Sequence, residues 1–368
     1  MGHDPVAKTT GTDRAFISHD RKIVTAPTEQ LQRGNVTRRC ACLEKAMQAE
    51  MDQHTKIGTW ELTDLPPDRT AMGCRWVFAV KTNPNGVFRK PKSHVVAQGF
   101  TQCPGMDYYE ITPPVIKFDS LRILLTIGNT LDWEIELMDV KGAFLNLNLE
   151  EEIYMNQPEG FEDGTGRFLK LRRALYGLKQ AGRTWHQQLR AALLSFNYTQ
   201  STADECVYIR ITGPSMEVIS VYVDDLGLFA NSKKGMKQMK RELNVKYTMT
   251  DLGEMKKILG LRVERNREEG TLKISQGPYI DAVLARFHMQ DANPVSTPLS
   301  KTVKLTNQTT HTIDDTPYAQ AIGSLMYTAL GTRPDLAFAV QHLSQFTTVH
   351  DIVWARALDR DQARTTIS

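Results

Sequence analysis

The sequence predicts an α+β fold, and three observations support this. The 368 residues are 41% hydrophobic and 24% charged, an ordinary globular composition, and the length is enough for two or three packed subdomains. Segments with helical spacing alternate along the chain with short strand-like segments. The strands are joined by hairpin turns and not by the regular strand–helix–strand crossovers of a doubly wound sheet.

The N-terminal elements are predicted to be one helix and one short strand. Residues 1–41 are mostly polar, so we expect a poorly ordered segment there. Apolar residues recur at i, i+4 and i+8 over residues 42–51, which predicts a helix. Residues 58–62 are strand-like and precede a turn at residues 66–67.

A β-hairpin is predicted next. Residues 75–81 are strand-like, the Asn-Pro-Asn-Gly sequence at residues 83–86 is a strong turn signal, and residues 88–98 supply the return strand. A helix should then begin near residues 119–120, an Asp-Ser pair that can cap its N-terminus, and run through Leu131.

The following segments place carboxylates at strand ends. Apolar and polar residues alternate from Trp133 onwards, which predicts a strand that ends at Asp139. Residues 184–196 are amphipathic and predict a helix. Residues 218–230 predict two strands joined by a tight turn at an Asp pair. The remaining predicted elements are a charged helix at 233–247, a strand pair at 258–263 and 272–274, and mainly helical segments at 279–287 and 318–346.

The most informative stretch is Val221-Tyr222-Val223-Asp224-Asp225-Leu226. Its apolar flanks bury the strands, so the two carboxylates are expected at a turn on the edge of a core. Ionised groups are costly there unless they are paired, hydrogen-bonded or metal-bound. An isolated Asp pair is more often a solvated hairpin turn, but Asp139 would bring a third carboxylate if its strand lies beside the pair. Three such carboxylates could bridge two Mg²⁺ ions roughly 3.5–4 Å apart.

A family resemblance follows from these and other residues. Tyr222-Val223-Asp224-Asp225 is similar to the polymerase signature of reverse transcriptases. Longer blocks resemble the copia-type retrotransposon polyprotein, in the order and spacing of that family from about residue 42 to residue 350. The blocks are residues 58–62, 74–78, 138–146, 152–161, 174–181, 185–186, 251–255, 259–260, 294–299, 322–327 and 332–335. The sequence therefore resembles the reverse transcriptase region of this family's polyproteins.

The resemblance implies a fold, a domain organisation and an activity. The fold would be a right-hand polymerase with fingers, a palm and a partial thumb or connection, whose antiparallel palm sheet carries helices on one face. The chain would comprise a poorly ordered segment (1–41), a fingers, palm and thumb region (42–299), connection helices (300–350) and a divergent, truncated tail (351–368). The activity would be that of an RNA-directed DNA polymerase, which adds deoxynucleoside triphosphates to the 3′-OH of a DNA or RNA primer on an RNA template by a two-metal mechanism.

The resemblance also implies a set of site residues. Asp139, Asp224, Asp225 and the backbone carbonyl of Val140 would hold two Mg²⁺ ions, with Mn²⁺ as an alternative ion. The nucleotide would be bound by Lys92, Phe144 and Gln180, with Phe144 as the gate that faces the ribose. Primer and template would contact Tyr222, Lys179, Arg183 and the turn at Leu259 and Gly260. Phe144 could instead be a plain core phenylalanine, and Gly260 an ordinary strand glycine.

The charge distribution adds a candidate nucleic-acid surface, although the net charge is only +3. Residues 164–203 contain no Asp or Glu, and such a basic segment is the electrostatic footprint expected of a primer–template groove. Its cations are Arg167, Lys170, Arg172, Arg173, Lys179, Arg183 and Arg190. Each of them taken singly also fits a solvated surface position. A second basic cluster at residues 233–241 fits a solvated helix face equally well.

The sequence departs from the family pattern in the fingers and in the tail. His94 and Gln98 stand where basic residues are usual, which would weaken the grip on the incoming triphosphate. Gly182 stands where a proline is usual, and the sequence contains no RNase H or integrase signature. The alternative function is therefore a catalytically decayed remnant that at most binds nucleic acid. A two-metal nucleotidyltransferase outside this family is a further alternative.

The sequence also makes predictions about location. No apolar run approaches the roughly 18–20 residues of a membrane span, and the N-terminus has no apolar signal core. The five cysteines match neither a disulfide framework nor a zinc site. We therefore expect an intracellular protein, in cytoplasmic virus-like particles or in the nucleus, that is neither secreted nor bound to a membrane.

Overall fold

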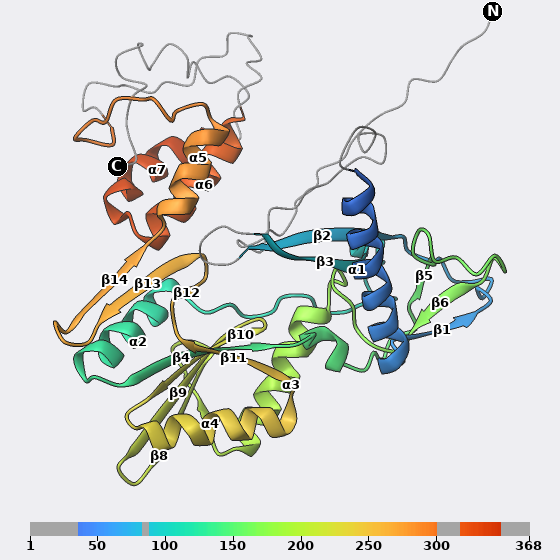
Figure 1. The fold of residues 1–368 in the computed structure, drawn as a ribbon, viewed down its shortest axis with the longest axis horizontal. Helices are drawn as coiled ribbons and strands as arrows, with labels where there is room; N and C mark the ends of the chain where they lie inside the picture. Colours follow the sequence, from blue (N-terminus) through green and yellow to red (C-terminus); the bar gives the residue numbers. More distant parts are fainter. Residues whose placement is uncertain (1–35, 83–87, 300–316, 347–368) are drawn as a thin grey trace, which may run out of the picture. The chain divides into compact units, whose positions relative to one another are not determined.

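The computed structural model describes residues 36–82, 88–299 and 317–346 (Figure 1). The chain forms two compact units. The first unit combines Met1–Ile111 with Phe144–Ala181, and the second combines Thr112–Ala143 with Gly182–Ser368. The predicted hairpin turn at 83–86 and the predicted tail at 351–368 lie outside the described residues, as do residues 1–35.

The first unit contains a long helix and two small sheets. Its elements are α1 (Val36–Ile57), β1 (Trp60–Thr63), β2 (Cys74–Thr82), β3 (Phe88–Ala97), η2 (Gly99–Thr101), β5 (Tyr154–Met155) and β6 (Phe168–Leu171). Strands β2 and β3 pair antiparallel, as the hairpin prediction requires, and β6 lies between β1 and β5 in the other sheet. The predicted N-terminal helix is confirmed, but α1 begins before residue 42 and continues past residue 51.

The second unit contains the largest sheet and most of the helices. Its first elements are α2 (Phe118–Thr130), β4 (Glu134–Val140), α3 (Ala181–Ser195), β7 (Thr199–Gln200), β8 (Val207–Thr212), β9 (Ser215–Tyr222), β10 (Asp225–Ala230), α4 (Lys233–Lys246) and β11 (Met249–Glu254). The later ones are β12 (Lys257–Ile258), β13 (Leu261–Asn266), β14 (Thr271–Ser275), α5 (Gly277–Arg286), α6 (Tyr318–Gly331), η4 (Pro334–Leu336) and α7 (Ala337–Ser344). The short helix η3 (Ala143–Asn146) lies where the chain passes from the second unit to the first.

The central sheet has the order β11-β4-β10-β9-β8-β7, and every neighbouring pair in it is antiparallel. The predicted antiparallel sheet and its two strands within residues 218–230 are therefore confirmed. The sequence interpretation did not predict β7, β8 or β11. Strand β11 has few apolar residues and is held by its pairing with β4. The register of this pairing shifts between Asp251 and Gly253.

Helices cover both faces of this sheet, so the prediction of helices on one face was wrong. Successive residues of a strand point to opposite faces. Gly128 of α2 lies against Ile135 of β4, so closely that an added Cβ would stand 2.9 Å from Ile135 Cδ1. Lys240 of α4 is hydrogen-bonded to Glu136, the next residue of β4. Both faces carry apolar residues, and each needs a helix to exclude water from it.

The start of α2 also differs from its prediction. The helix begins at Phe118, and Lys117 occupies the N-cap position without a side-chain capping bond. The backbone N–H of Lys117 donates instead to Asp204 Oδ2 at 2.9 Å. Residues 119–120 lie inside the first turn. The negative charge of Asp119 there interacts favourably with the positive N-terminal end of the helix dipole. A distant carboxylate therefore replaces the expected local cap.

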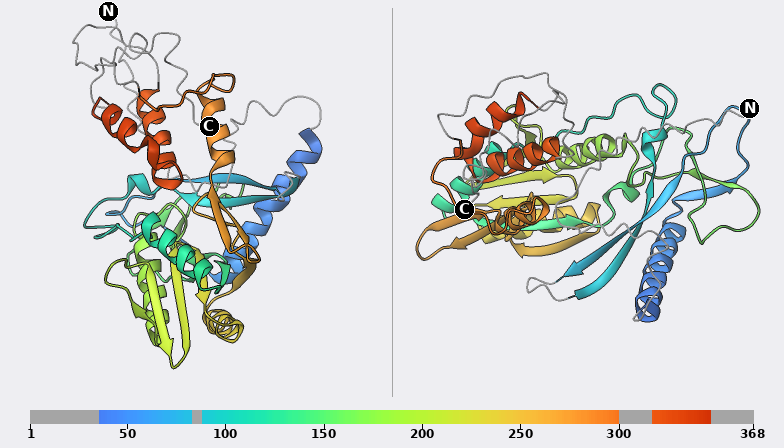
Figure 2. Two further views of the ribbon diagram at one scale, coloured as in Figure 1. Left: turned by 90° about the vertical axis from the view of Figure 1, so that its left-hand side faces the viewer. Right: turned by 90° about the horizontal axis from the view of Figure 1, so that it is seen from above.

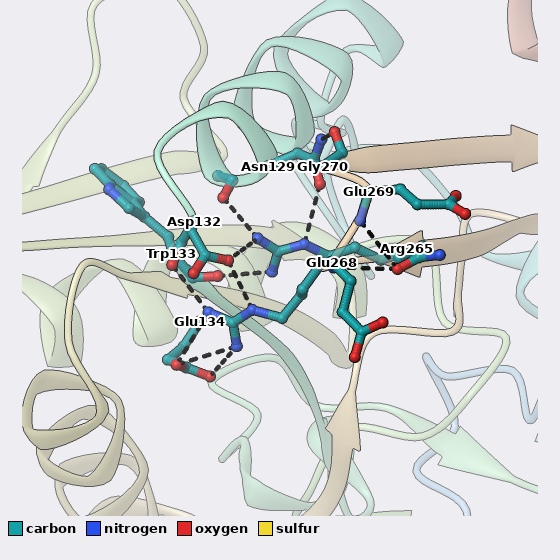
Figure 3. A network of polar contacts seen from close by, with 11 residues as sticks. Asn129, Asp132, Trp133, Glu134, Arg265, Glu268, Glu269 and Gly270 are labelled. Atoms are coloured by element: carbon teal, nitrogen blue, oxygen red, sulfur yellow. Dashed lines mark hydrogen bonds and ion pairs between the residues drawn. The ribbon is translucent and has the colours of Figure 1, made fainter.

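The hairpin of β13 and β14 is fastened to the turn between α2 and β4 by two arginines (Figure 3). Arg265 donates to Asn129 Oδ1 at 3.1 Å, Gly128 O at 3.1 Å and Trp133 O at 2.7 Å. Only 5% of its side chain is exposed. Arg267 forms ion pairs with Asp132 and Glu134. Arg265 thereby donates to Gly128 O, one of the carbonyls that the C-terminal end of α2 leaves without a helical partner, and to Trp133 O just before β4.

Helices α5, α6 and α7 lie together next to this hairpin in the second unit (Figures 1 and 2). Helices α6 and α7 share a buried cluster with η4, formed by Ile322, Ala329, Leu336 and Val340. The helices predicted within residues 279–287 and 318–346 are therefore confirmed. In the described part of the chain, no helix has the length and apolar content needed to cross a bilayer.

Candidate active site

The Asp pair lies at a two-residue turn between β9 and β10. Tyr222 and Asp225 are paired as the last and first residues of these strands, and Val223 and Asp224 form the loop between them. The flanking Val221 and Leu226 are buried, whereas the turn residues are half-buried. The predicted position of the pair, at a turn on the edge of a core, is therefore confirmed.

The strand that carries Asp139 lies beside this turn. Strand β10 pairs antiparallel with β4, and Asp225 stands directly opposite Asp139. Directly opposed residues of antiparallel strands have their Cα atoms about 4.5–5.5 Å apart and their side chains on one face. Two like charges in such a pair repel each other unless a cation compensates them. The expected neighbourhood of the two strands is confirmed.

Two further residues complete this row across the sheet. Thr250 of β11 stands opposite Asp139 on its other side, and Tyr222 stands opposite Asp225. Burial raises the pKa of the Tyr222 hydroxyl, and the negative charges of Asp225 and Asp224 raise it further. The phenol is therefore a neutral hydrogen-bonding group beside the carboxylates at physiological pH. Thr250 was not singled out from the sequence, because only the pairing of β11 brings it there.

The turn is held by hydrogen bonds from two other elements. The indole Nε1–H of Trp185 in α3 donates to the carbonyl of Val223 at 2.6 Å. The backbone N–H of Val140 in β4 donates to the carbonyl of Asp224 at 2.8 Å. Val223 has a φ of +53°, in the left-handed region that a β-branched residue rarely adopts. Trp185 was predicted as part of a helix face and of a family block, so this contact was not expected.

The donor set is chemically suited to Mg²⁺, because carboxylate and carbonyl oxygens are its preferred protein ligands. The register brings two of the three predicted carboxylates face to face, and Asp224 is adjacent in the turn. Over the residues that the structure describes, however, no three or more His, Cys, Asp or Glu side chains are grouped so that they could hold a metal ion. The metal site of Asp139, Asp224, Asp225 and the Val140 carbonyl stays a prediction.

Four of the other predicted site residues belong to the first unit. Lys92 is an exposed residue of β3. Phe144 is 9% exposed, and its ring lies edge-on to Tyr176 with the ring centres 4.7 Å apart. Such packing is what a core phenylalanine shows. A role of Phe144 as a ribose gate stays a prediction.

Lys179 and Gln180 make contacts with the loop after β3. Gln180 is 3% exposed; its Oε1 accepts from Gln102 Nε2 at 3.0 Å, and its own Nε2 donates to Asp107 O at 2.9 Å. Lys179 Nζ lies 3.0 Å from Tyr108 Oη and 4.7 Å from the centre of that ring. The structure therefore shows both side chains in contacts within the first unit. Their binding of nucleotide or template stays a prediction.

The remaining predicted contacts belong to the second unit. Arg183 is in α3. Leu259 and Gly260 form a two-residue turn between β12 and β13, with φ values of +51° and +71°. These are the signs of a type I′ hairpin, so Gly260 is a turn residue and not an ordinary strand glycine. The hydroxyl of Tyr327 in α6 donates to the Leu259 carbonyl. Contact with the primer stays a prediction.

His94 does not occupy an exposed position. It is 8% exposed, and its Nδ1 lies 3.0 Å from Oε1 of Glu50 in α1. Burial alone would raise the pKa of the Glu50 carboxyl, but hydrogen bonds from His54 and His94 outweigh it and lower the pKa to about 2. The side chain of His94 thus joins β3 to α1, and the weaker grip on the triphosphate expected from the missing cation stays a prediction. Partners so distant in the sequence leave no local signal.

Three of the seven cations in the basic segment 164–203 form ion pairs with carboxylates that lie outside the segment. Its ion pairs join Arg167 to Asp163, Lys170 to Glu152, and Arg172 to Glu61. These pairs are at least partly exposed, so they add little stability, but they reduce the positive potential that the sequence suggested. The local basic surface expected of a primer–template groove stays a prediction.

Comparisons with known proteins agree with the resemblance seen in the sequence. A family described as "Reverse transcriptase (RNA-dependent DNA polymerase)" matches residues 57–301. The chain is 40% identical over 314 residues to the Retrovirus-related Pol polyprotein from transposon TNT 1-94 of Nicotiana tabacum, covering 83% of this chain and 24% of that protein. It is 39% identical over 305 residues to the Pol polyprotein from transposon RE1 of Arabidopsis thaliana, covering 82% of this chain and 21% of that protein.

A solved structure of the foamy viral protease-reverse transcriptase in complex with double-stranded DNA matches 94% of this chain and 51% of that one, at 12% identity and a TM-score of 0.42. The chain spans about a quarter of the length of the curated relatives named above, 24% and 21%. The family match covers more than half of the chain, and both relatives are well above 30% identical to it. The chain belongs to the reverse transcriptase region of the copia-type retrotransposon Pol polyproteins.

Proposed function

We propose that this chain is an RNA-directed DNA polymerase that extends a DNA or RNA primer on an RNA template with deoxynucleoside triphosphates. The observation that carries the proposal is the register in which Asp225 stands opposite Asp139, with Asp224 next to it in the turn. Membership of the reverse transcriptase family supports the same activity. We also infer a right-hand polymerase fold, in which the central sheet of the second unit is the palm and the β2–β3 hairpin belongs to the fingers.

The proposed metal ligands are Asp139, Asp224, Asp225 and the carbonyl of Val140. When bound, two Mg²⁺ or Mn²⁺ ions would lower the pKa of the primer hydroxyl and stabilise the leaving pyrophosphate. The protein's own part is to present the carboxylates on one face of the sheet. The hydrogen bond from Val140 N–H to the Asp224 carbonyl ties the turn to β4, so that the carboxylates of the two strands keep a fixed separation.

The other predicted residues have proposed roles in binding. We assign phosphate and ribose contacts to Lys92, Phe144 and Gln180. Primer or template contacts are assigned to Tyr222, Lys179, Arg183 and the Leu259–Gly260 turn. The position of Tyr222 opposite Asp225 in the sheet supports its assignment as a primer or template contact. An intracellular location, in virus-like particles or the nucleus, stays a prediction.

Primer extension tests the proposed activity. The unaltered protein is expected to add deoxynucleotides to a primer on an RNA template in the presence of Mg²⁺. Asp139→Asn and Asp225→Asn should each reduce the rate by about 100-fold or more, because each removes a carboxylate charge that would hold the Mg²⁺ ions. Asp251→Asn is the matched control. Asp251 belongs to the same sheet but pairs with Lys240, so this variant should keep its rate.

Metal binding is measured separately from turnover. Mg²⁺ should raise the midpoint of thermal unfolding of the unaltered protein and of Asp251→Asn, because a ligand that binds only the folded state stabilises it. It should not do so for Asp139→Asn. Extension that is equally fast in the Asp139 and Asp225 variants would reject the proposed site, whatever the unfolding data show.

A decayed remnant that at most binds nucleic acid is the second candidate. The observation that favours it is His94, which is buried against Glu50 where the family usually carries a cation. Such a protein would bind primer–template with an affinity that falls steeply with salt and does not respond to Mg²⁺. It would extend no primer. Robust extension by the unaltered protein would exclude this candidate.

A further inference from the structure

The turn that carries the Asp pair has an unfavourable backbone conformation. Val223 is the first residue of the two-residue loop between β9 and β10, and its φ is +53°. Glycine is the usual residue where that position needs a positive φ, because it has no side chain to clash. Among the described residues with a positive φ, Val223 is the only one that is β-branched. Such strain persists only where surrounding contacts enforce it, and it is typical of functional sites.

One side chain supplies such a contact. Trp185 is 1% exposed, and its Nε1–H donates to the carbonyl of Val223 at 2.6 Å. An indole has this single donor, and a buried donor that loses its partner is costly. The ring of Tyr247 in the segment after α4 packs edge-on against the indole at 5.2 Å. The indole is thereby fixed in the orientation that aims its N–H at the turn.

A second hydrogen bond completes the restraint. The carbonyl of Asp224 accepts from the backbone N–H of Val140 at 2.8 Å. Each of the two loop residues therefore has its carbonyl held by a different element, α3 for Val223 and β4 for Asp224. With both peptide groups held, the directions in which Asp224 and Asp225 leave the backbone are fixed relative to β4.

We propose that Trp185 is a positioning residue, whose indole N–H holds the Val223–Asp224 turn in its strained conformation and so fixes the Asp224 and Asp225 carboxylates relative to Asp139. The proposal rests on the proposed function for the role of those carboxylates. It predicts that loss of the N–H lowers turnover while primer–template binding is kept, because the indole is buried and presents no surface to a ligand.

The test variant is Trp185→Phe, which removes the N–H and keeps an aromatic ring. The matched control is Trp76→Phe in the first unit, because Trp76 Nε1 also donates to a backbone carbonyl, that of Glu159, at 3.0 Å. We expect kcat of Trp185→Phe to fall about 10- to 100-fold, the effect of a small misplacement of catalytic groups. The KM for primer–template should change by less than about twofold. Trp76→Phe should leave both constants within about twofold.

Removing the strain provides a rescue. Glycine adopts a positive φ without steric cost, so Val223→Gly should make the turn less dependent on the indole. Trp185→Phe should then lower kcat by a smaller factor in the Val223→Gly background than alone, a non-additivity expected of coupled residues. Fully additive effects would overturn the proposal, because a simple loss of core packing at Trp185 has no reason to depend on the conformation of Val223.

Amide hydrogen exchange separates this proposal from the proposed function. The Val140 N–H, bonded to the Asp224 carbonyl, should exchange about tenfold or more faster in Trp185→Phe than in the unaltered protein, and should not change in Trp76→Phe. If the exchange responds but the unaltered protein extends no primer, the proposed function fails and the restraint stands. Unchanged exchange with unchanged kcat would overturn the restraint alone. Should Trp185→Phe not fold, a benzothienyl side chain at this position, with sulfur in place of the N–H, makes the same test with the ring size retained.

Discussion

At the scale of single residues, Glu50 shows how strongly local contacts change a buried group. Its side chain is 9% exposed, and Oε1 lies 3.0 Å from His94 Nδ1 and 3.4 Å from His54 Nε2. Burial opposes its ionisation, but the two histidine hydrogen bonds prevail and lower the pKa to about 2. The ordinary pKa of a glutamate, expected in the unfolded state, is 4.5. The folded state therefore stabilises the ionised form of Glu50 more than the unfolded state does.

A pH dependence of stability follows for this residue. Because the folded-state pKa is lowered, the contribution of Glu50 is fully present above about pH 4.5 and is lost as the pH falls towards 2. Glu50→Gln should lower the free energy of unfolding at pH 7 by at most about 3 kcal/mol, and by progressively less below pH 4.5. Chemical denaturation between pH 2 and pH 7 measures this.

The control for Glu50 is Glu44→Gln, an exposed position of the same helix. It should change the unfolding free energy by less than about 0.5 kcal/mol at every pH. If Glu50→Gln showed the same small, pH-independent effect, the cluster with His54 and His94 would not stabilise the fold.

At the scale of elements, the β13–β14 hairpin depends on Arg265 (Figure 3). Burial lowers the pKa of this guanidinium, and the positive charge of Arg267 lowers it further. Its hydrogen bonds to Asn129, Gly128 O and Trp133 O offset that cost. The strand that starts after the Leu259–Gly260 turn is thereby fastened to the end of α2 and the start of β4, the strand of Asp139.

Arg265→Met tests this attachment, because it keeps an unbranched apolar stem and removes every donor. The carbonyls of Gly128 and Trp133 would lose their guanidinium partner, so we expect the free energy of unfolding to fall by about 2–4 kcal/mol. Arg262→Met on the same strand is the control, because its side chain is 63% exposed and pairs with Glu264. Denaturant unfolding compares the two, and equal small losses would show that the network does not hold the hairpin.

At the scale of the whole molecule, the predicted site residues are divided between the two units. Asp139 belongs to the second unit and Phe144, a few residues later, to the first. The cations of segment 164–203 are divided in the same way, between residues up to Ala181 and residues from Gly182 on. Three of the five cations in the first unit form ion pairs there, so the number of cations in the segment overstates the positive charge that it offers to a nucleic acid.

Salt dependence distinguishes cations that bind nucleic acid from those that do not. Arg183→Gln should reduce the slope of log affinity against log salt by about 0.9, the release of one phosphate counterion. Arg172→Gln should leave the slope unchanged, because Arg172 pairs with Glu61. Fluorescence anisotropy with a labelled primer–template gives both slopes. Equal slopes for Arg183→Gln and the unaltered protein would remove Arg183 from the proposed contacts.

The sequence by itself determined the elements whose signals are local. The amphipathic helix at 184–196, the strand ending near Asp139 and the two strands around the Asp pair all follow from spacing within a few residues. The family could also be identified from ordered blocks of residues. These helices and strands could be predicted from the sequence because hydrophobic periodicity and turn preference depend on residues that are near neighbours along the chain.

Only the tertiary structure decided how distant residues meet. The register of Asp225 on Asp139 depends on the pairing of β10 with β4, and the partners of His94 and Gln180 come from α1 and from the loop after β3. Strand β11, which supplies Thr250, is held by β4 and has little apolar pattern of its own. Trp185 had the same apolar helix-face signal as Leu189, yet only Trp185 donates to the turn of the Asp pair. The physical reason is that a hydrogen bond or ion pair depends on distance and direction in space, which separation along the chain does not determine.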